Sequence, residues 1–131
     1  HPGEMKRLLS GFDLEDHLNS DRMTQAAVLA ERLDSTVVLK GARTVICSPD
    51  GRMSINSTGS PALAKAGTGD CLAGMIGAFL SQGMEAFEAA EAAVFIHGLA
   101  GELSACGQRG LTAESLVEGI PLAMRRISPF A

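Results

Sequence analysis

The chain has 131 residues, of which 46% are hydrophobic, with no tryptophan or tyrosine and a formal net charge of −4. This length suits one modest domain, and the acidic balance argues against a nucleic-acid-binding surface. Three cysteines without a Cys-x-x-Cys pair indicate free thiols in a reducing compartment. No signal peptide and no membrane-spanning apolar run is apparent. We therefore expect a cytoplasmic protein that binds neither nucleic acid nor membrane.

The first part of the chain predicts two helices followed by three short strands. A turn at His1-Pro2-Gly3 leads into a helix over residues 4–9, and Asp21 is expected to cap a helix over residues 22–33. Short apolar or alternating runs predict strands at residues 36–39, 44–48 and 53–56. The turn Pro49-Asp50-Gly51 indicates that the last two strands form a hairpin.

The second part predicts three helices. One runs from a Gly-Thr-Gly-Asp motif to about Gln82, with Gly83 as its C-terminal cap. The next covers residues 85–106 and is apolar nearly all round between residues 89 and 100, so it should be largely buried, with His97 as a structural histidine. After a loop at residues 107–110, Thr112 should cap a helix over residues 113–127, which Pro121 should kink or break.

The motif Gly67-Thr68-Gly69-Asp70 stands where a loop of small residues turns into an apolar helix. A helix N-terminus with unpaired N–H groups and nearby glycines predicts an anion site, most often one for phosphate. Asp70 is either a helix cap or a general base for a hydroxyl beside that phosphate. A Walker A loop is excluded because no Gly-Lys-Ser/Thr is present, and Leu72 replaces the third glycine of a dinucleotide fingerprint.

Three further residues allow two interpretations each. Lys40, at a strand end before Gly41, could reach a phosphate or could simply be exposed. His1 could face a ligand or could belong to a disordered terminus. Cys71 lies in a first helical turn, where a thiol pKa can fall, but no cationic residue adjoins it, so we read it as a packing residue.

Four segments together carry a family resemblance that extends over essentially the whole chain. They are His1-Pro2-Gly3-Glu4-Met5, residues 40–46, residues 56–74, and His97-Gly98-Leu99-Ala100-Gly101 with residues 110–113. In this order they resemble the C-terminal half of the ADP/ATP-dependent NAD(P)H-hydrate dehydratases of the ribokinase-like superfamily. Three positions depart from the family pattern, and all keep small side chains: Ser60, Ala62 and Ala66.

The resemblance implies an α/β fold, namely a three-layer α/β/α arrangement with a mostly parallel central sheet. Residues 1–131 would be the C-terminal part of a single nucleotide-binding domain about twice as long. The chain starts at His1 without a methionine, so we expect a fragment whose sheet has an open edge. A homo-oligomer and an upstream epimerase domain or partner are also implied.

The resemblance further implies roles for individual residues. Asp70 would be the catalytic base and a substrate contact, with His1 as a second contact to hydrated nicotinamide. The N–H groups of Gly67, Thr68 and Gly69 would form an anion hole for the transferred phosphoryl group. The nucleotide-binding residues would be Lys40, Gly41, Ala42, Arg43, Thr44 and Gly69. Mg²⁺ would bridge the phosphates of ADP or ATP, with no dedicated protein ligands.

The implied activity is that of a lyase that repairs hydrated NADH or NADPH. The hydroxyl on carbon 6 of the nicotinamide ring would be phosphorylated from ADP or ATP, and loss of phosphate would then restore NAD(P)H. Two alternatives stay open: a sugar or vitamin-precursor kinase of the same superfamily, and a nucleotide-binding fragment without catalysis.

Overall fold

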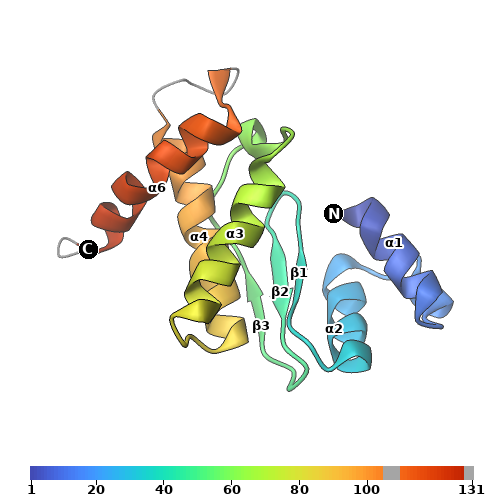
Figure 1. Ribbon diagram of the computed structural model, residues 1–131. Helices are drawn as coiled ribbons and strands as arrows, with labels where there is room; N and C mark the ends of the chain where they lie inside the picture. Colours follow the sequence, from blue (N-terminus) through green and yellow to red (C-terminus); the bar gives the residue numbers. More distant parts are fainter. Residues whose placement is uncertain (105–109, 129–131) are drawn as a thin grey trace. The chain divides into compact units, whose positions relative to one another are not determined.

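The computed structural model describes residues 1–104 and 110–128 (Figure 1). The chain divides into two compact units, His1–Asn56 and Ser57–Ala131. The loop expected at residues 107–110 lies, apart from Gly110, outside the described residues, and so does Cys106. No described helix is both long enough and apolar enough to cross a membrane.

Unit 1 contains the two helices and three strands that the sequence predicts, together with one short 3-10 helix that it does not. Their bounds are α1 Pro2–Gly11, η1 Glu15–His17, α2 Arg22–Leu33, β1 Val37–Leu39, β2 Val45–Cys47 and β3 Met53–Ile55. The bounds of α2 match the prediction because Asp21 caps it: the Thr24 N–H donates to Asp21 Oδ1 at 2.9 Å. Helix α1 is longer at both ends than the predicted range of residues 4–9. Its earlier start is explained by Pro2, since proline suits a first helical turn.

The three strands form one antiparallel sheet in the order β1-β2-β3. Val37 is opposite Cys47, and Val45 is opposite both Leu39 and Ile55. A mixed α/β class is confirmed, but the expectation of a mostly parallel sheet is wrong for the strands that the structure describes in this chain. The physical reason is the length of the connections, residues 40–44 and 48–52. They suit hairpins, whereas a parallel pairing needs a crossover of about a dozen or more residues.

The core of unit 1 is formed around α2, which packs on β1 and β2 and also contacts α1. Apolar side chains recur along α2 at helical spacing and meet the inward side of the strands. The buried residues of this core are Met5, Leu9, Ala26, Leu29, Ala30, Leu39, Val45 and Cys47. Complete burial of a leucine such as Leu29 contributes roughly 1.5–3 kcal/mol. This packing fixes the ends of β1 and β2, and hence the loop that joins them.

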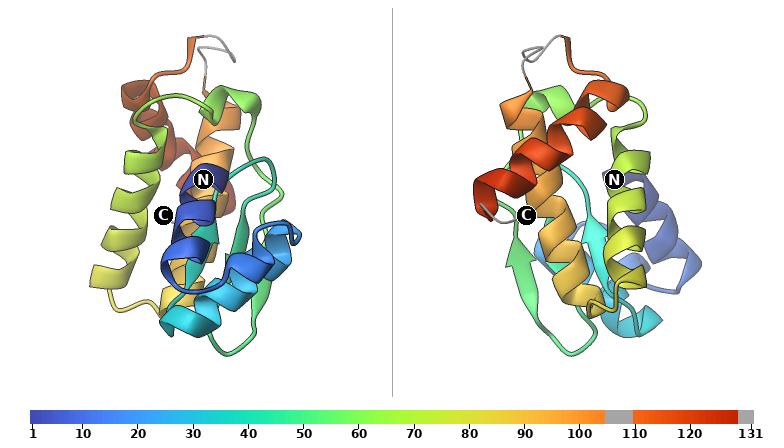
Figure 2. Two further views of the ribbon diagram at one scale, coloured as in Figure 1. Left: turned by 90° about the vertical axis from the view of Figure 1, so that its right-hand side faces the viewer. Right: turned by 60° about the vertical axis from the view of Figure 1, so that its left-hand side comes forward.

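Unit 2 consists of η2 Pro61–Leu63 and the helices α3 Thr68–Ser81, α4 Ala86–Leu103 and α6 Ala113–Ile127. Helix α4 contacts both α3 and α6, and Figure 2 shows α6 crossing it. The three predicted helices are present. Helix α3 ends at Ser81, with Gln82 as its C-cap and Gly83 (φ 89°) after it, close to the prediction. Helix α4 ends at Leu103, before the expected end at Cys106. Of the two expected effects of Pro121, a break in α6 is wrong, because the helix continues to Ile127, while a kink stays a prediction. Pro121 removes the bond to the carbonyl of Val117, and both residues are exposed, so water can replace that bond.

Most of α4 is buried, as its apolar composition predicts. Its buried residues are Phe87, Ala89, Ala90, Ala93, Val94, Ile96, His97, Gly98, Ala100 and Gly101. The two glycines let the segment before α3 lie directly on the helix: a Cβ on Gly98 would overlap Thr58, and one on Gly101 would come within 2.8 Å of Leu63 Cδ2. Thr58 Oγ1 also donates to the carbonyl of Phe95 at 2.8 Å. The segment that leads to the motif at residues 67–70 is therefore held against α4.

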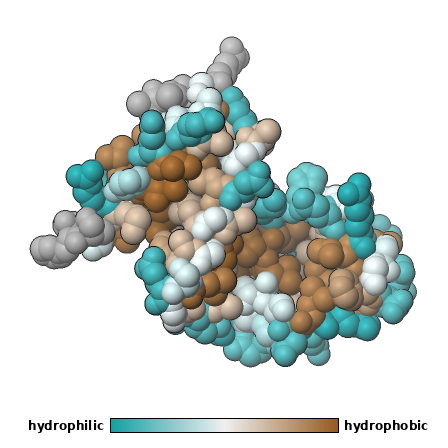
Figure 3. All heavy atoms as spheres, in the orientation of Figure 1, coloured by the Kyte–Doolittle hydropathy of each residue, from teal (hydrophilic) through white to brown (hydrophobic). Residues whose placement is uncertain are grey.

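Apolar side chains also reach the surface of each unit, where brown areas stand beside polar ones in Figure 3. The large exposed apolar residues are Leu8, Phe12, Met23, Met53 and Ile55 in unit 1, and Leu80, Phe95, Leu103, Val117, Leu122 and Ile127 in unit 2. In unit 1 two of them belong to β3, which lies at one edge of the sheet.

Candidate functional site

The N-terminus of α3 in unit 2 is built around Gly67. This residue is the N-cap and has φ 84°, and no side chain caps the helix. A Cβ on Gly67 would lie 3.0 Å from Ala113 Cβ, so both the backbone conformation and the space favour glycine. Asp70 is the third residue of the helix rather than its cap, which makes the cap interpretation of Asp70 wrong. Its carboxylate is exposed on the first turn.

The first backbone N–H groups of α3 precede the hydrogen-bonded part of the helix. Cys71 N–H makes the first helical bond, to Gly67 O at 3.1 Å. The four preceding N–H groups, of residues 67–70, therefore have no acceptor within the helix. That of Thr68 is 3.4 Å from Lys65 O, a long contact. The N–H groups of Gly67, Gly69 and Asp70 are thus the best placed to bind an anion at this helix end.

Thr68 anchors the loop before α3. It is 4% exposed, and its Oγ1 lies 2.7 Å from Leu63 O and 2.8 Å from Lys65 O. A hydroxyl has one proton to donate, so the two carbonyls share it. The side chain therefore points into the unit and leaves only backbone atoms of Thr68 for a ligand.

His97 supports the same turn from α4. Its Nε2 lies 2.9 Å from Thr68 O, and because a carbonyl only accepts, Nε2 carries the hydrogen. Burial lowers the pKa of His97, while the bond to Thr68 O opposes that shift. The prediction of a buried structural histidine is confirmed. Its contact with the motif was missed, and the only signal in the sequence is a histidine inside an apolar run.

Of the two described cysteines, Cys47 is buried and Cys71 is partly buried. Burial raises the pKa of both the Cys47 and the Cys71 thiol, which keeps them protonated and poorly nucleophilic. The interpretation of Cys71 as a packing residue agrees with this.

In unit 1 the predicted nucleotide segment is the loop between β1 and β2. Gly41 has φ 153° and Arg43 has φ 56°, so both have positive φ. Thr44 Oγ1 donates to Gly41 O at 3.2 Å and closes the loop. The guanidinium of Arg22, at the start of α2, donates to four carbonyls of residues 39–43. Sequence reasoning missed this contact, because nothing in the pattern links Arg22 to a loop some 20 residues later.

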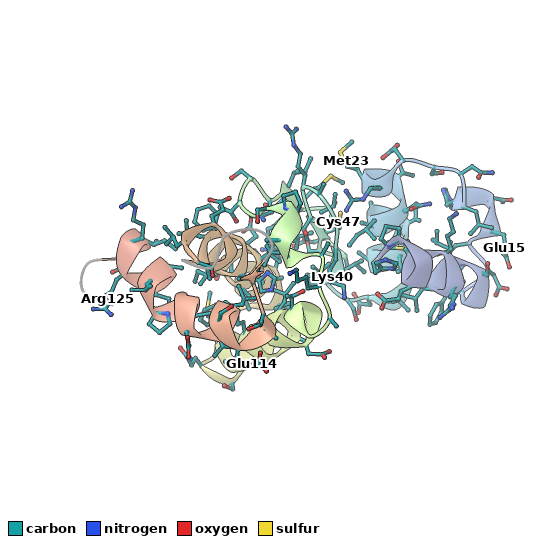
Figure 4. The ribbon with its side chains drawn as sticks, turned by 90° about the horizontal axis from the view of Figure 1, so that it is seen from above. Glu15, Met23, Lys40, Cys47, Glu114 and Arg125 are labelled. Carbon is teal, nitrogen blue, oxygen red and sulfur yellow. The ribbon has the colours of Figure 1, made fainter. Side chains whose placement is uncertain are left out.

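Unit 1 brings the His1-Pro2-Gly3-Glu4 turn beside this loop. His1 is the N-cap of α1, since its Nδ1 accepts the Gly3 N–H at 3.2 Å. One turn on, Glu4 Oε2 lies 3.9 Å from Lys40 Nζ, where the Glu4 side chain is 61% and the Lys40 side chain 41% exposed. Figure 4 shows Lys40 at the end of unit 1 opposite Glu15. Two predicted contacts, His1 and Lys40, lie near one another, because the N-terminal amine of His1 and Lys40 Nζ both approach Glu4 Oε2, at 3.0 and 3.9 Å.

In residues 1–104 and 110–128, no group of three or more His, Cys, Asp or Glu side chains is arranged to hold a metal ion. A divalent cation that bound to this part of the chain would need ligands from elsewhere, and nucleotide phosphates are the usual ones for Mg²⁺.

Comparison with known proteins identifies the family. Residues 1–122 match the Carb_kinase family, NAD(P)H-hydrate dehydratase. Over 129 residues the chain is 46% identical to the bifunctional NAD(P)H-hydrate repair enzyme Nnr of Thermofilum pendens, covering 97% of this chain and 24% of that protein. The ADP-dependent (S)-NAD(P)H-hydrate dehydratase of Neisseria meningitidis is 40% identical over 103 residues, which are 79% of this chain and 34% of the relative.

A solved structure agrees with this. The ADP/ATP-dependent NAD(P)H-hydrate dehydratase of Bacillus subtilis, co-crystallised with ATP and Mg²⁺, matches with a TM-score of 0.85 and 38% identity. The match covers 98% of this chain and 46% of the other, so the chain spans about half of that enzyme and about a quarter of the bifunctional relatives. On these grounds the chain belongs to the NAD(P)H-hydrate dehydratase family.

Proposed function

We propose that this chain supplies the phosphoryl-transfer part of an enzyme that restores NAD(P)H from its hydrate at the expense of ADP or ATP. The observation that carries the proposal is the start of α3, where N–H groups without helical acceptors stand beside the exposed carboxylate of Asp70. Membership of the dehydratase family supports the choice of substrate.

In this proposal Asp70 accepts the proton of the hydroxyl on carbon 6 of the hydrated ring. The freed oxygen bonds to the terminal phosphorus of the nucleotide, and the bond from that phosphorus to the bridging oxygen breaks. Charge on the transferred phosphoryl group is stabilised by the N–H groups of Gly67 and Gly69, with a weaker part for Thr68, whose N–H is directed at Lys65 O. Phosphate then leaves carbon 6 with its bonding electron pair, and the ring loses a proton to regain the double bond.

We infer that the loop of residues 40–44 binds the nucleotide, through Lys40, Gly41, Ala42, Arg43 and Thr44, with a further contact from Gly69. His1 is proposed to contact the hydrated nicotinamide. The relative co-crystallised with ATP and Mg²⁺ supports a magnesium nucleotide as co-substrate. When bound, Mg²⁺ would neutralise phosphate charge, with the nucleotide's phosphates as its expected ligands.

We also infer a wider setting for the chain. Residues 1–131 would be part of one three-layer ribokinase-like domain, cytoplasmic and homo-oligomeric, whose remaining strands complete the sheet. Several relatives are bifunctional repair enzymes, and this supports an epimerase domain or partner working beside the dehydratase. A kinase of the same superfamily remains the competing function, because it would use the same anion site and base.

The proposal is tested with the longest natural form of the protein. It is mixed with hydrated NADH, Mg²⁺ and ADP or ATP, and the near-ultraviolet absorbance of NADH is followed. Asp70→Asn should lower kcat by about 10²–10⁴-fold, the usual contribution of a general base, while nucleotide binding persists. Glu114→Gln is the matched control, since Glu114 is an exposed carboxylate in the first turn of α6 (Figure 4).

Two results would overturn this function. No nucleotide-dependent recovery of NADH by the natural protein would favour the kinase, which a phosphorylated product from a sugar or vitamin precursor would then establish. Normal turnover by Asp70→Asn would remove Asp70 from the role of base.

A further inference from the structure

Arg22 makes more hydrogen bonds to the loop of residues 40–44 and its neighbours than any side chain within that loop. Its Nη1 lies 2.8 Å from Ala42 O and 3.4 Å from Arg43 O. Its Nη2 lies 3.0 Å from Leu39 O and 3.2 Å from Lys40 O. A planar guanidinium with donors in a fixed fork can hold several carbonyls at once, which the ammonium of a lysine cannot match.

The position of Arg22 is itself fixed. It is the first residue of α2, directly after the cap Asp21, whose two carboxylate oxygens each accept a bond from Thr24 at 2.9 Å. The helix behind it packs on β1 and β2 through the core of unit 1. The backbone of Arg22 therefore belongs to a well-packed helix, from which the side chain reaches the loop.

This contact sets the direction of the peptide groups in the loop. Peptide groups are planar, and no described bond is cis, so each N–H points away from the carbonyl of its own peptide. With the carbonyls of residues 39, 40, 42 and 43 turned towards Arg22, the N–H groups of Lys40, Gly41, Arg43 and Thr44 turn the other way. These N–H groups are thus directed away from Arg22, and none of them is taken up by its guanidinium.

The positive charge of Arg22 also favours an anionic ligand near the loop of residues 40–44. Among the described residues, no carboxylate forms an ion pair with Arg22, and its Nε is buried without a partner. The Arg22 charge faces carbonyl dipoles and adds to that of Arg43 near the loop, whereas the charge of Lys40 is partly offset by Glu4. Glycine at position 41 leaves room for the guanidinium, because a Cβ there would lie 2.8 Å from Arg22 Nη2.

We propose that Arg22 is a positioning residue for the nucleotide: its four hydrogen bonds hold the loop of residues 40–44 in the shape that binds ADP or ATP. This inference rests on the proposed function, which assigns the loop to the nucleotide. Arg22 itself lies on the carbonyl side of the loop and acts through it.

The test compares Arg22→Met and Arg22→Lys with Arg32→Met in the longest natural form of the protein. Arg32 is exposed in the last turn of the same helix, so Arg32→Met removes the same charge without touching the loop. For Arg22→Met we expect the KM for the nucleotide to rise at least tenfold, with kcat and the KM for hydrated NADH within twofold of the natural protein. For Arg22→Lys the KM for the nucleotide should rise by an intermediate amount, because lysine keeps the charge but lacks the planar arrangement of donors. Arg32→Met should be unchanged.

Two results would overturn the role of Arg22. One is an unchanged nucleotide KM in Arg22→Met. The other is a rise of both KM values and a fall of kcat by the same factor, together with a lower melting temperature. That result would mark a merely structural residue. If the natural protein shows no dehydration at all, the proposed function fails, and calorimetric titration with ADP and ATP decides instead. Binding weakened tenfold in Arg22→Met would support the inference, whereas equal binding, or no binding by the natural protein, would overturn it.

Discussion

Replacing Gly67 by alanine tests whether the start of α3 depends on the conformation seen there. The backbone of Gly67 is left-handed, with φ 84°, which costs a residue with a Cβ roughly 1–2 kcal/mol. The new Cβ would also lie 3.0 Å from Ala113 Cβ, inside the normal separation of about 3.5–4.0 Å. Overpacking of this kind adds about 1–3 kcal/mol. The free energy of unfolding should therefore fall by about 2–5 kcal/mol.

Activity should fall further than stability alone explains. The strain is relieved most easily by a shift of the loop, and a misplacement of about 1 Å at a reacting centre can cost about 10²-fold in rate. We expect kcat/KM for NADH recovery to fall by that order in Gly67→Ala, measured at a temperature where the variant is fully folded. Urea unfolding supplies the stability of each variant under the same conditions.

Gly83 provides the matched control at the other end of α3. Its φ is 89°, close to that of Gly67, but a Cβ there would have nothing within 4 Å. Gly83→Ala should therefore carry the backbone cost alone and leave kcat/KM within twofold. In addition, Gly67→Ala combined with Ala113→Gly should recover part of the lost stability, because the contact is relieved. Full activity of Gly67→Ala, or no difference between the two glycine variants, would refute the reasoning.

Two further predictions concern α4. Burial holds the pKa of His97 below 6.5, so the unfolded chain takes up a proton before the folded one as the pH falls. Between pH 7 and pH 5 the natural protein should then lose more unfolding free energy in urea than His97→Gln, and equal losses would contradict this. Gly98→Ala should destabilise by about 1–3 kcal/mol because its Cβ would overlap Thr58. Gly77 in α3 is the control, because a Cβ there would have nothing within 4 Å, so Gly77→Ala should stabilise by up to about 1 kcal/mol. A change of stability with the same sign in both variants would argue against close packing at Gly98.

Local signals in the sequence predicted most elements correctly. The bounds of α2 and α6 follow from Asp21 and Thr112, whose side chains accept bonds from the first helical turn. The three strands were placed within a residue or two by short apolar runs between turns. The expectation of a mostly parallel sheet came from the family resemblance, although connections as short as residues 40–44 and 48–52 already favour antiparallel pairing.

The candidate site was predictable only in part, because its supports come from distant segments. The motif at residues 67–70 predicted a helix start with free N–H groups, but the choice of Gly67 over Asp70 as cap depends on backbone φ, which the residue types do not fix. Arg22 lies 17–21 residues before the carbonyls that it binds, and His97 lies 29 residues after Thr68, whose carbonyl it binds. A single sequence without pairwise information does not reveal such contacts.

The small side chains of α4 have an evolutionary consequence. Where Ala89, Ala90, Ala93 and Ala100 are buried, with relative exposures of 0–1%, the contact surface is almost the bare backbone. At these four positions there is no methylene group to exchange for another of similar volume, so a larger side chain there needs compensating changes in the elements packed against it. These positions should therefore vary less between related proteins than the exposed Glu88, Phe95 and Glu102 of the same helix.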